Sequence, residues 1–182
     1  MVYSLYCAKD YLLNTKSDII ISYGDIIFEQ SIIEKLLLIN SDFSIIVDKD
    51  WLKVWNIRFK NPLDDAETLK LDDDGYIKEI GRKTDNINEI EGQYIGLIKI
   101  KNSIIKKIFK FYENLQKSLL INNFQNIYMT DFLQELINSN WKIKPVFVKN
   151  RWLEFDNVSD YKVYSRLYDT GKLSEYFDLN SN

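Results

Sequence analysis

Two acidic segments that lie far apart in the chain carry the residue types best suited to bind a divalent cation. In the first, Asp18 to Phe28, an apolar stretch stops at Gly24 and Asp25. The second, Trp152 to Asp156, also ends in an aspartate. An acid that follows a strand faces solvent at the strand end, where an open α/β sheet places its ligand site. We therefore predict that Asp25 and Asp156 form a carboxylate pair suited to a hard cation such as Mg²⁺.

Both acids have structural alternatives. A Gly-Asp pair after a strand is also typical of an ordinary turn. In the functional interpretation, Gly24 lets a ligand approach the backbone closely, and the neighbouring Tyr23 belongs to the same site. Glu154 competes with Asp156 for the second position, as does Asp160. The simpler interpretation of those two residues is a solvated strand face and a charge near a helix start.

Further candidates for the site lie between the two acidic segments. Lys83 could contact a phosphate as a point charge, and Arg82 could do so through two hydrogen bonds. A following stretch with acids, an amide and an aromatic ring could line a pocket for a small cationic or polar ligand, and its candidate residues are Glu91, Gln93 and Tyr94. An ordinary surface loop is the alternative for each of these segments.

Composition excludes several classes of function. The chain has 24 basic and 27 acidic residues and a net charge of -3, which argues against the basic surface that nucleic-acid binding requires. It has no histidine, which excludes histidine triads and imidazole zinc sites. A nucleophile that is already an anion, such as a phosphate monoester, needs no general base from the protein.

The single cysteine, Cys7, excludes an internal disulfide, and no signal pattern precedes it. We therefore expect a cytoplasmic location. No apolar run reaches the roughly 20 residues that a membrane helix needs. At 182 residues the chain can bury a full core as one domain, residues 1–182.

The elements that must position these residues alternate between short buried strands and amphipathic helices, which predicts an α/β fold with a mixed sheet. We expect the first strand to be covered on both faces, Ser31 and Glu34 to form a capping box, and Ser159 to cap the last helix. The predicted strands are Ile19–Ser22, Ile45–Val47, Tyr94–Ile100 and Lys144–Val148, with a hairpin at Glu67–Leu71 and Tyr76–Ile80. The predicted helices are Val2–Leu13, Ser31–Ile39, Ile104–Leu115, Met129–Ile137 and Asp160–Tyr168.

Four segments in this order resemble the nucleotidyltransferases that activate sugar phosphates and related phosphoesters: Tyr-Gly-Asp at 23–25, the hairpin segment 66–83, the segment 89–97 and the segment 152–160. Within that superfamily the chain is most similar to cytidylyltransferases for small phosphorylated alcohols and amino compounds, such as phosphocholine and phosphoglutamine cytidylyltransferases of surface-polymer pathways. The resemblance rests on the ordered set, because no single motif is as specific as a Walker sequence.

The resemblance implies a Rossmann-like nucleotidyltransferase fold with a mixed, mostly parallel sheet. It implies that Asp25 and Asp156 hold Mg²⁺, that Lys83 contacts a phosphate, and that Trp152 and Glu154 belong to the substrate site. The implied substrates are a nucleoside triphosphate, with CTP favoured, and a small phosphorylated acceptor used to build surface or capsule polysaccharide. Pyrophosphate is the implied leaving group.

One departure from the family pattern concerns the start of the chain. The family begins with a strand, a Gly-rich loop with an arginine and a Pro-Lys motif, and nothing in the segment 1–17 matches them. We therefore expect a nucleotidyltransferase domain without its amino-terminal segment and first strands, either part of a longer protein or a degenerate copy. Such a sheet would expose an unpaired edge that could pair with a second copy, giving a homodimer.

Two other functions remain open at this point. A degenerate transferase could act as a non-catalytic binding module. A glycosyltransferase of similar topology would want an Asp-x-Asp sequence after a strand, which Asp48-Lys49-Asp50 offers. Trp51 and Trp55, with Arg58, either cover a ligand or pack as a helical stripe.

Overall fold

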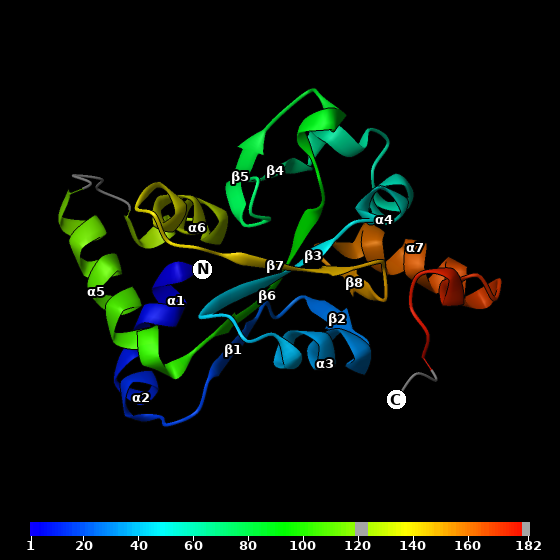
Figure 1. The fold of residues 1–182 in the computed structure, drawn as a ribbon. Coiled ribbons are helices and arrows are strands. Elements are labelled where there is room, and N and C mark those ends of the chain that lie inside the picture. Colours follow the sequence, from blue (N-terminus) through cyan, green and yellow to red (C-terminus); the bar gives the residue numbers. More distant parts are fainter. Residues whose placement is uncertain (119–123, 180–182) are drawn as a thin grey trace.

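A computed structural model describes residues 1–118 and 124–179 and contains a four-stranded sheet in the order β1-β6-β3-β7 (Figure 1). The strands are β1 (Ile19–Ser22), β6 (Gln93–Ile100), β3 (Phe43–Asp48) and β7 (Lys144–Val148). Strand β6 runs antiparallel to both β1 and β3, whereas β3 and β7 are parallel. Strands β1, β3 and β7 therefore point the same way, which confirms the predicted mixed and mostly parallel sheet.

Two pairs of shorter strands complete the β-structure. Strands β2 (Ile26–Phe28) and β8 (Trp152–Glu154) follow β1 and β7 closely in the sequence and pair antiparallel to each other. The predicted hairpin is confirmed as β4 (Glu67–Leu71) and β5 (Ile77–Lys83). Strand β5 continues three residues beyond its predicted end, so Lys83 is the last residue of a strand instead of part of a loop.

Helices cover both faces of the sheet (Figure 1). One face packs against α1 (Val2–Cys7), α5 (Asn102–Ser118) and α6 (Met129–Asn138), with α2 (Lys9–Asn14) beside α5. The other face packs against α3 (Gln30–Leu38) and α4 (Trp51–Arg58), and α7 (Val158–Asp169) lies against α4. The result is the three-layer arrangement expected from the alternation of strands and helices.

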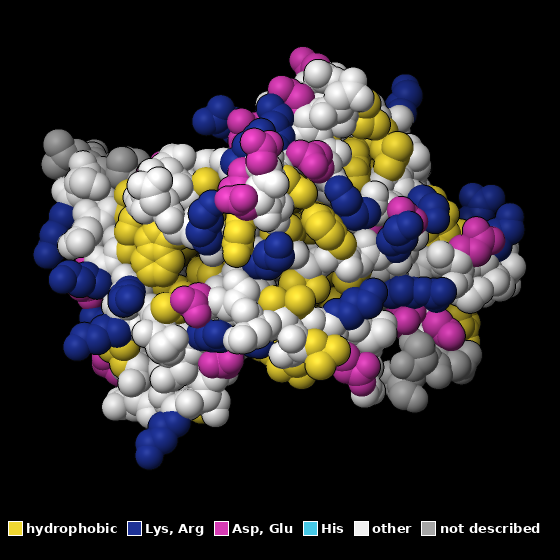
Figure 2. All heavy atoms as spheres, viewed as in Figure 1, with side chains coloured by type: hydrophobic (Ala, Val, Ile, Leu, Met, Phe, Trp, Pro, Cys, Tyr) yellow, Lys and Arg dark blue, Asp and Glu magenta, His cyan; other side chains and the backbone are white. Residues whose placement is uncertain are grey.

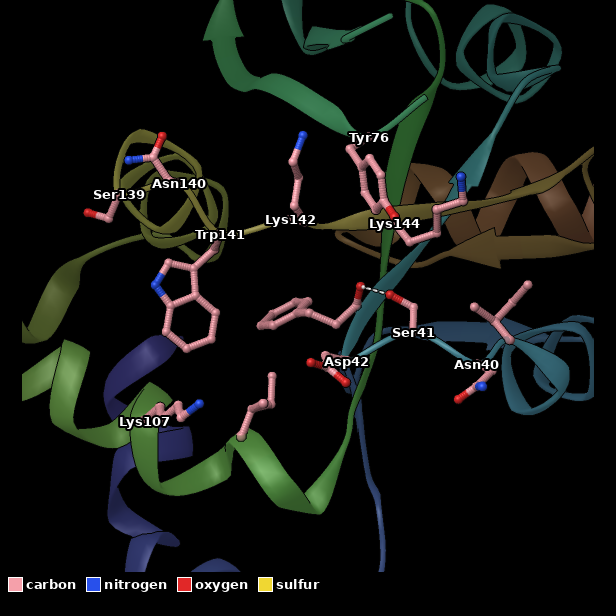
Figure 3. Close-up of a pocket in the computed structure, with 13 residues that line it drawn as sticks. Asn40, Ser41, Asp42, Tyr76, Lys107, Ser139, Asn140, Trp141, Lys142 and Lys144 are labelled. Atoms are coloured by element: carbon pink, nitrogen blue, oxygen red, sulfur yellow. Dashed lines mark hydrogen bonds between the residues drawn. The ribbon is translucent and has the colours of Figure 1, made fainter. Parts of the chain in front are cut away.

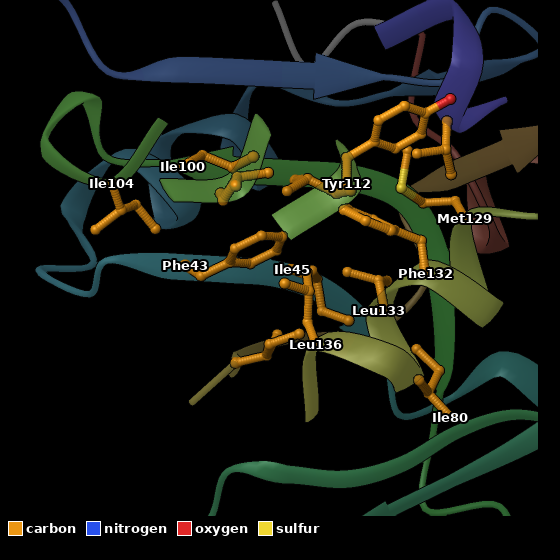
Figure 4. Packing of buried hydrophobic residues seen from close by; sticks show 14 of the residues in the cluster. Phe43, Ile45, Ile80, Ile100, Ile104, Tyr112, Met129, Phe132, Leu133 and Leu136 are labelled. Atoms are coloured by element: carbon orange, nitrogen blue, oxygen red, sulfur yellow. The ribbon is translucent and has the colours of Figure 1, made fainter. Parts of the chain in front are cut away.

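Alternation along β3 separates the two cores. Phe43, Ile45 and Val47 point to the α5 and α6 side, and Figure 4 shows the first two packed beside Phe132, Leu133 and Leu136 of α6. Ile46 points to the opposite side and contacts the cluster that includes the α3 and α4 residues. Every residue of β3 is buried, as a central strand with helices on both faces requires.

Several local predictions were wrong. Strand β1 lies at the edge of the sheet, and only its first residue, Ile19, is buried. It pairs with β6 on one side, and no strand within the described residues pairs with its other side. The long amino-terminal helix is two short helices separated at Ala8. Helix α3 begins at Gln30 without a side-chain cap, so the Ser31 capping box does not form. Asn157, not Ser159, caps α7.

Charged side chains of both signs are interspersed over the face shown in Figure 2. This agrees with the near balance of charges in the sequence. Among the described residues, no helix combines the length and apolarity that crossing a membrane would require.

Candidate active site

An open cavity of about 360 Å³ lies at the edge of the sheet formed by the carboxyl ends of β1, β3 and β7 and the start of β6. This is the edge where the sequence predicts a ligand site. The cavity collects seven of the ten predicted site residues from four separate segments of the chain. They are Tyr23, Asp25, Lys83, Gln93, Tyr94, Glu154 and Asp156.

Pairing of β2 with β8 places the two predicted cation ligands next to each other. Ile26 lies opposite Glu154, and the carbonyl of Asp25 accepts a hydrogen bond of 2.8 Å from the backbone N–H of Phe155. Asp25 and Asp156 therefore lie at the same backbone hydrogen bond, although 130 residues lie between them in the sequence. The Asp25 carboxylate is exposed and makes no hydrogen bond or ion pair within the described residues.

A buried arginine holds the acids of the second segment. The Arg58 side chain is fully buried, and its guanidinium donates to Glu154 at 2.6 Å, to Asp156, and to Asp160 at 3.1 Å. Although burial disfavours its charge, hydrogen bonds and charges of the carboxylates raise the pKa of Arg58 above its usual value. One oxygen of Asp156 contacts Arg58, and the other stays free of hydrogen bonds within the described chain.

Asp160 fixes the backbone of this segment. Its carboxylate accepts hydrogen bonds from the backbone N–H groups of Asp156 at 3.0 Å and Asn157 at 3.2 Å, and the Asn157 side chain caps the same helix in return. Asp160 is 2% exposed. Of the two rivals for the second cation position, Asp160 thus has a structural role as part of a capping box.

Glu154 titrates near neutrality. Burial raises the pKa of its carboxyl to about 7, and the negative charges of Asp156 and Asp25 add to that rise, while Arg58 opposes it. The physical reason is a shortage of cations, because a single guanidinium cannot neutralise three carboxylates. Glu154 can therefore carry a proton near neutral pH.

The hairpin supplies a cation and an acid on the opposite wall of the cavity. Lys83 lies opposite Glu67 in the β4–β5 register, and its ammonium donates to the backbone carbonyls of Asp65 at 2.7 Å and Asp64 at 3.3 Å. Burial raises the pKa of Glu67, against the opposing charge of Lys83. The Lys83 ammonium thus sits at the cavity without a side-chain ion pair within the described residues.

Two tyrosines and a glutamine form a further wall of the cavity. The Tyr23 and Tyr94 rings meet edge to face with centroids 5.7 Å apart, and burial raises the pKa of both hydroxyls, so both are neutral at physiological pH. The Gln93 side chain donates to the carbonyl of Glu67 at 2.6 Å and thereby joins the hairpin to β6. Gln93 therefore fixes the distance between the hairpin and the main sheet.

Three predicted site residues do not line this cavity. Trp152 is 1% exposed, and its indole donates to Asp48 at 2.8 Å within the core. Glu91 accepts a hydrogen bond from the backbone of Leu71. Gly24 lies in an adjoining cavity of about 310 Å³ that shares Tyr23 and Asp25.

Asp48 has no free oxygen for the Asp-x-Asp alternative. It is fully buried, and its two oxygens accept from the backbone N–H groups of Asp50 and Asn150 and from the Trp152 indole. A metal at this position would have to displace three hydrogen bonds. The geometry therefore gives the glycosyltransferase alternative no support.

Other residues of the cavity were not predicted from the sequence. Glu67 starts the predicted hairpin, Asp65 precedes it, and Tyr128 and Thr130 stand at the start of α6. Trp55 packs in the α4 stripe, one of the two alternatives that the sequence left open, and it also lines the cavity. The packing of α6 on β5 brings Tyr128 and Thr130 to the site, and no local pattern of residues marks that contact.

The donor set fits Mg²⁺ better than a metal held by protein alone. Within the described residues, no three of the Asp, Glu and Cys side chains are placed to hold a metal ion. Asp25 and Asp156 supply hard carboxylate oxygens from two adjacent segments, and Mg²⁺ is usually held by one or two carboxylates together with substrate phosphates and water. These two residues could hold the ion when a phosphate substrate completes its coordination.

Comparisons with known proteins agree with this geometry. No family model matches the chain. The CTP:phosphoglutamine cytidylyltransferase of Campylobacter jejuni is 45% identical over 168 residues, which cover 90% of this chain and 66% of that protein. The chain thus spans slightly less than two thirds of its relative's length.

Solved structures share the fold at low identity. The inositol-1-phosphate CTP transferase from T. maritima has a TM-score of 0.64 and 18% identity, over 97% of this chain and 63% of its own. The CTP:phosphocholine cytidylyltransferase from Streptococcus pneumoniae has a TM-score of 0.60 and 16% identity, over 91% and 62%. The sequence match and the shared fold together confirm the predicted resemblance: this chain is similar to nucleotidyltransferases, and to the cytidylyltransferases among them.

Proposed function

We propose that the protein transfers a cytidylyl group from CTP to a small phosphorylated acceptor and releases pyrophosphate, in the synthesis of a surface-polymer precursor. The observation that carries this proposal is the convergence of Asp25, Asp156 and Lys83 on one open cavity at the carboxyl edge of the sheet. The similarity to a CTP:phosphoglutamine cytidylyltransferase supports the choice of nucleotide and of a phosphorylated acceptor.

The proposed reaction forms one P–O bond and breaks another. A phosphate oxygen of the acceptor attacks the α-phosphorus of CTP, and the bond between that phosphorus and the bridging oxygen breaks to release pyrophosphate. The attacking oxygen is already anionic, so the absence of histidine from the chain is no obstacle. Catalysis then depends on positioning the two phosphates and on balancing their charge.

Each residue has a defined part in this proposal. Asp25 and Asp156 would hold Mg²⁺, which when bound neutralises phosphate charge and orients the leaving group. Lys83 would place its ammonium against a phosphate oxygen, in exchange for one of its two contacts with backbone carbonyls. Arg58 keeps Asp156 in place. Glu67 and Glu154 give the cavity acidic side chains that suit an acceptor with an amino group.

The test is pyrophosphate release by this chain with Mg²⁺, each nucleoside triphosphate and a panel of phosphorylated acceptors that includes phosphocholine and phosphoglutamine. We expect release only with CTP and one class of acceptor. Asp25→Asn should lower turnover by at least about 100-fold, because it removes one anionic ligand of the ion, while the far-UV circular dichroism spectrum stays unchanged.

Asp73→Asn is the matched control, since Asp73 is an exposed acid in the hairpin turn, away from the cavity. Turnover of that variant should equal the wild-type value. Full turnover by Asp25→Asn would refute the proposed cation ligand. Absence of pyrophosphate release with every nucleotide and acceptor would refute catalysis by this chain and favour a binding module.

A further inference from the structure

A second cavity, of about 770 Å³, lies at the opposite end of the sheet from the candidate active site. It opens where β3 and β7 begin, beside the end of α6 and the first turns of α5. We call it the distal cavity and define it by Phe43, Tyr76, Lys107, Trp141 and Lys144. Figure 3 shows Trp141 and Lys107 on one side of the distal cavity and Tyr76 and Lys144 on the other.

The charge of the distal cavity differs in sign from that of the whole chain. Three lysines and one aspartate line it, although the net charge of the protein is -3. Lys142 is neutralised by Asp72 at 3.2 Å and Asp74 at 3.7 Å, and Asp42 pairs with Lys101 at 3.5 Å. The positive charges that remain belong to Lys107 and Lys144.

Neither of those two lysines has an acidic partner within the described residues. Lys107 is exposed on α5 and makes no ion pair there. The Lys144 ammonium lies 4.9 Å from the centre of the Tyr76 ring, and its hydrogen bond to the carbonyl of Gly75 is long, at 3.5 Å. Lys142, which Asp72 and Asp74 neutralise, lies near the same ring at 5.0 Å.

The walls between the lysines are aromatic and amide-bearing. Trp141 is half-buried and presents its indole to the cavity, Phe43 forms the floor, and Asn40 and Asn140 add amide groups at the rim. Flat aromatic faces bind planar rings by stacking, amides hydrogen-bond ring edges, and lysines bind phosphate. We propose that the distal cavity binds a nucleoside phosphate at a second site, separate from the cavity that would carry out transfer.

The tryptophans allow the two cavities to be observed separately. The chain has four of them, and Trp55 lines the candidate active site while Trp141 lines the distal cavity. In ¹⁵N-edited spectra each indole N–H gives one signal, and Trp141→Phe identifies the distal one. Titration with CMP should shift the Trp141 signal to saturation at millimolar CMP or below, with its own dissociation constant.

Lys107→Ala combined with Lys144→Ala should weaken the Trp141 response at least tenfold and leave the other indole signals in place, which shows that the fold is retained. Lys106→Ala is the matched control, because Lys106 is an exposed neighbour on α5 that does not line the distal cavity. That variant should bind CMP as the wild type does.

Three results would overturn the proposal: an unmoved Trp141 signal, an undiminished response in the double variant, or inorganic phosphate that binds as tightly as CMP. The last result would mark a simple anion site. This test is independent of the proposed function, because pyrophosphate release and the Trp55 signal report on the other cavity. Either site can therefore fail while the other stands.

Discussion

Arg58 shows how one residue organises several others. Its guanidinium has enough donors to contact Glu154, Asp156 and Asp160 at once, and a planar fork of this kind is something that lysine cannot provide. Its single charge leaves a net negative cluster beside Asp25. A negatively charged site suits a divalent cation and a positively charged acceptor. Lys83, on the opposite wall, would then offset the negative charge of a phosphate group.

The Glu154 carboxyl makes stability depend on pH. Its pKa is about 7 in the folded protein, above the ordinary value of 4.5, so the folded state binds more protons between these two values. The stability that the protonated group contributes is complete below about pH 4.5 and is lost as the pH rises through 7. Glu154→Gln should remove this loss, because glutamine stays neutral throughout.

The measurement is the midpoint of urea unfolding from pH 5 to pH 8 for both proteins. We expect the variant to match the wild type near pH 5 and to exceed it at pH 8, with a difference of about 1–2 kcal/mol when screening at the partly open site is allowed for. Glu113→Gln serves as a reference on the opposite side of the fold, since Lys9 and Tyr6 hold that carboxyl and lower its pKa. The prediction would be contradicted if the urea midpoint changed with pH equally in the wild type and in Glu154→Gln.

At the scale of elements, the cavity depends on a bulge in β6. The register between β3 and β6 shifts between Ile45 and Val47, and Gly96 lies in the extra stretch with a φ of +85°. The carbonyl of Gly96 accepts a hydrogen bond of 2.9 Å from the backbone of Tyr23, and the Tyr23 ring covers its α-carbon. The bulge thereby sets where the Tyr23 side chain enters the cavity.

Gly96→Ala should therefore destabilise the protein and displace Tyr23. A Cβ at this position would lie 2.6 Å from the Tyr23 ring, and a positive φ costs a residue with a side chain about 1–2 kcal/mol before any clash. From the backbone cost alone we expect the melting temperature, measured by circular dichroism, to fall by about 2–8 °C.

Gly24→Ala gives the comparison for that substitution. Gly24 has no positive φ, and a Cβ there would meet no atom within 4 Å. The free energy of unfolding of Gly24→Ala should stay within about 0.5 kcal/mol of the wild-type value. A similar loss in both variants would show that glycine flexibility alone, and not the contact with Tyr23, explains the effect.

At the scale of the whole molecule, two hydrophobic cores share one sheet. Ile45 and Val47 belong to one core, and Ile46 between them belongs to the other. Neither core can lose its packing without exposing one face of β3 and β6. One domain over residues 1–182 stays a prediction, which this arrangement leads us to test.

A single cooperative transition is the expected consequence. Trp51, Trp55 and Trp152 lie in one core and Trp141 packs against the other, so tryptophan fluorescence reports mainly on the first. Urea unfolding followed by tryptophan fluorescence and by far-UV circular dichroism should give the same midpoint and slope. Two separate midpoints would instead show that the two faces unfold as independent units.

The sequence by itself determined the class of the fold and named acids that the cavity brings together. Strand and helix positions follow from local periodicity, so Ile19–Ser22 and Lys144–Val148 match the structure residue for residue. The resemblance pointed to Asp156 over Glu154 and Asp160. The structure places Asp160 in the first turn of α7, where it forms a capping box with Asn157, while the cation ligands stay a prediction. The caps were missed, because Ser, Asn and Asp at adjacent positions offer equivalent local signals.

Only the tertiary structure decided which residues share a site. Insertion of β6 between β1 and β3 made β1 an edge strand, and β2–β8 pairing brought Asp25 to Glu154 and Asp156. The packing of α4 against α7 brought Arg58 into contact with Glu154, Asp156 and Asp160. These contacts join positions about 100 residues apart, and such long-range pairing depends on the burial of whole faces, which no local pattern of residues encodes.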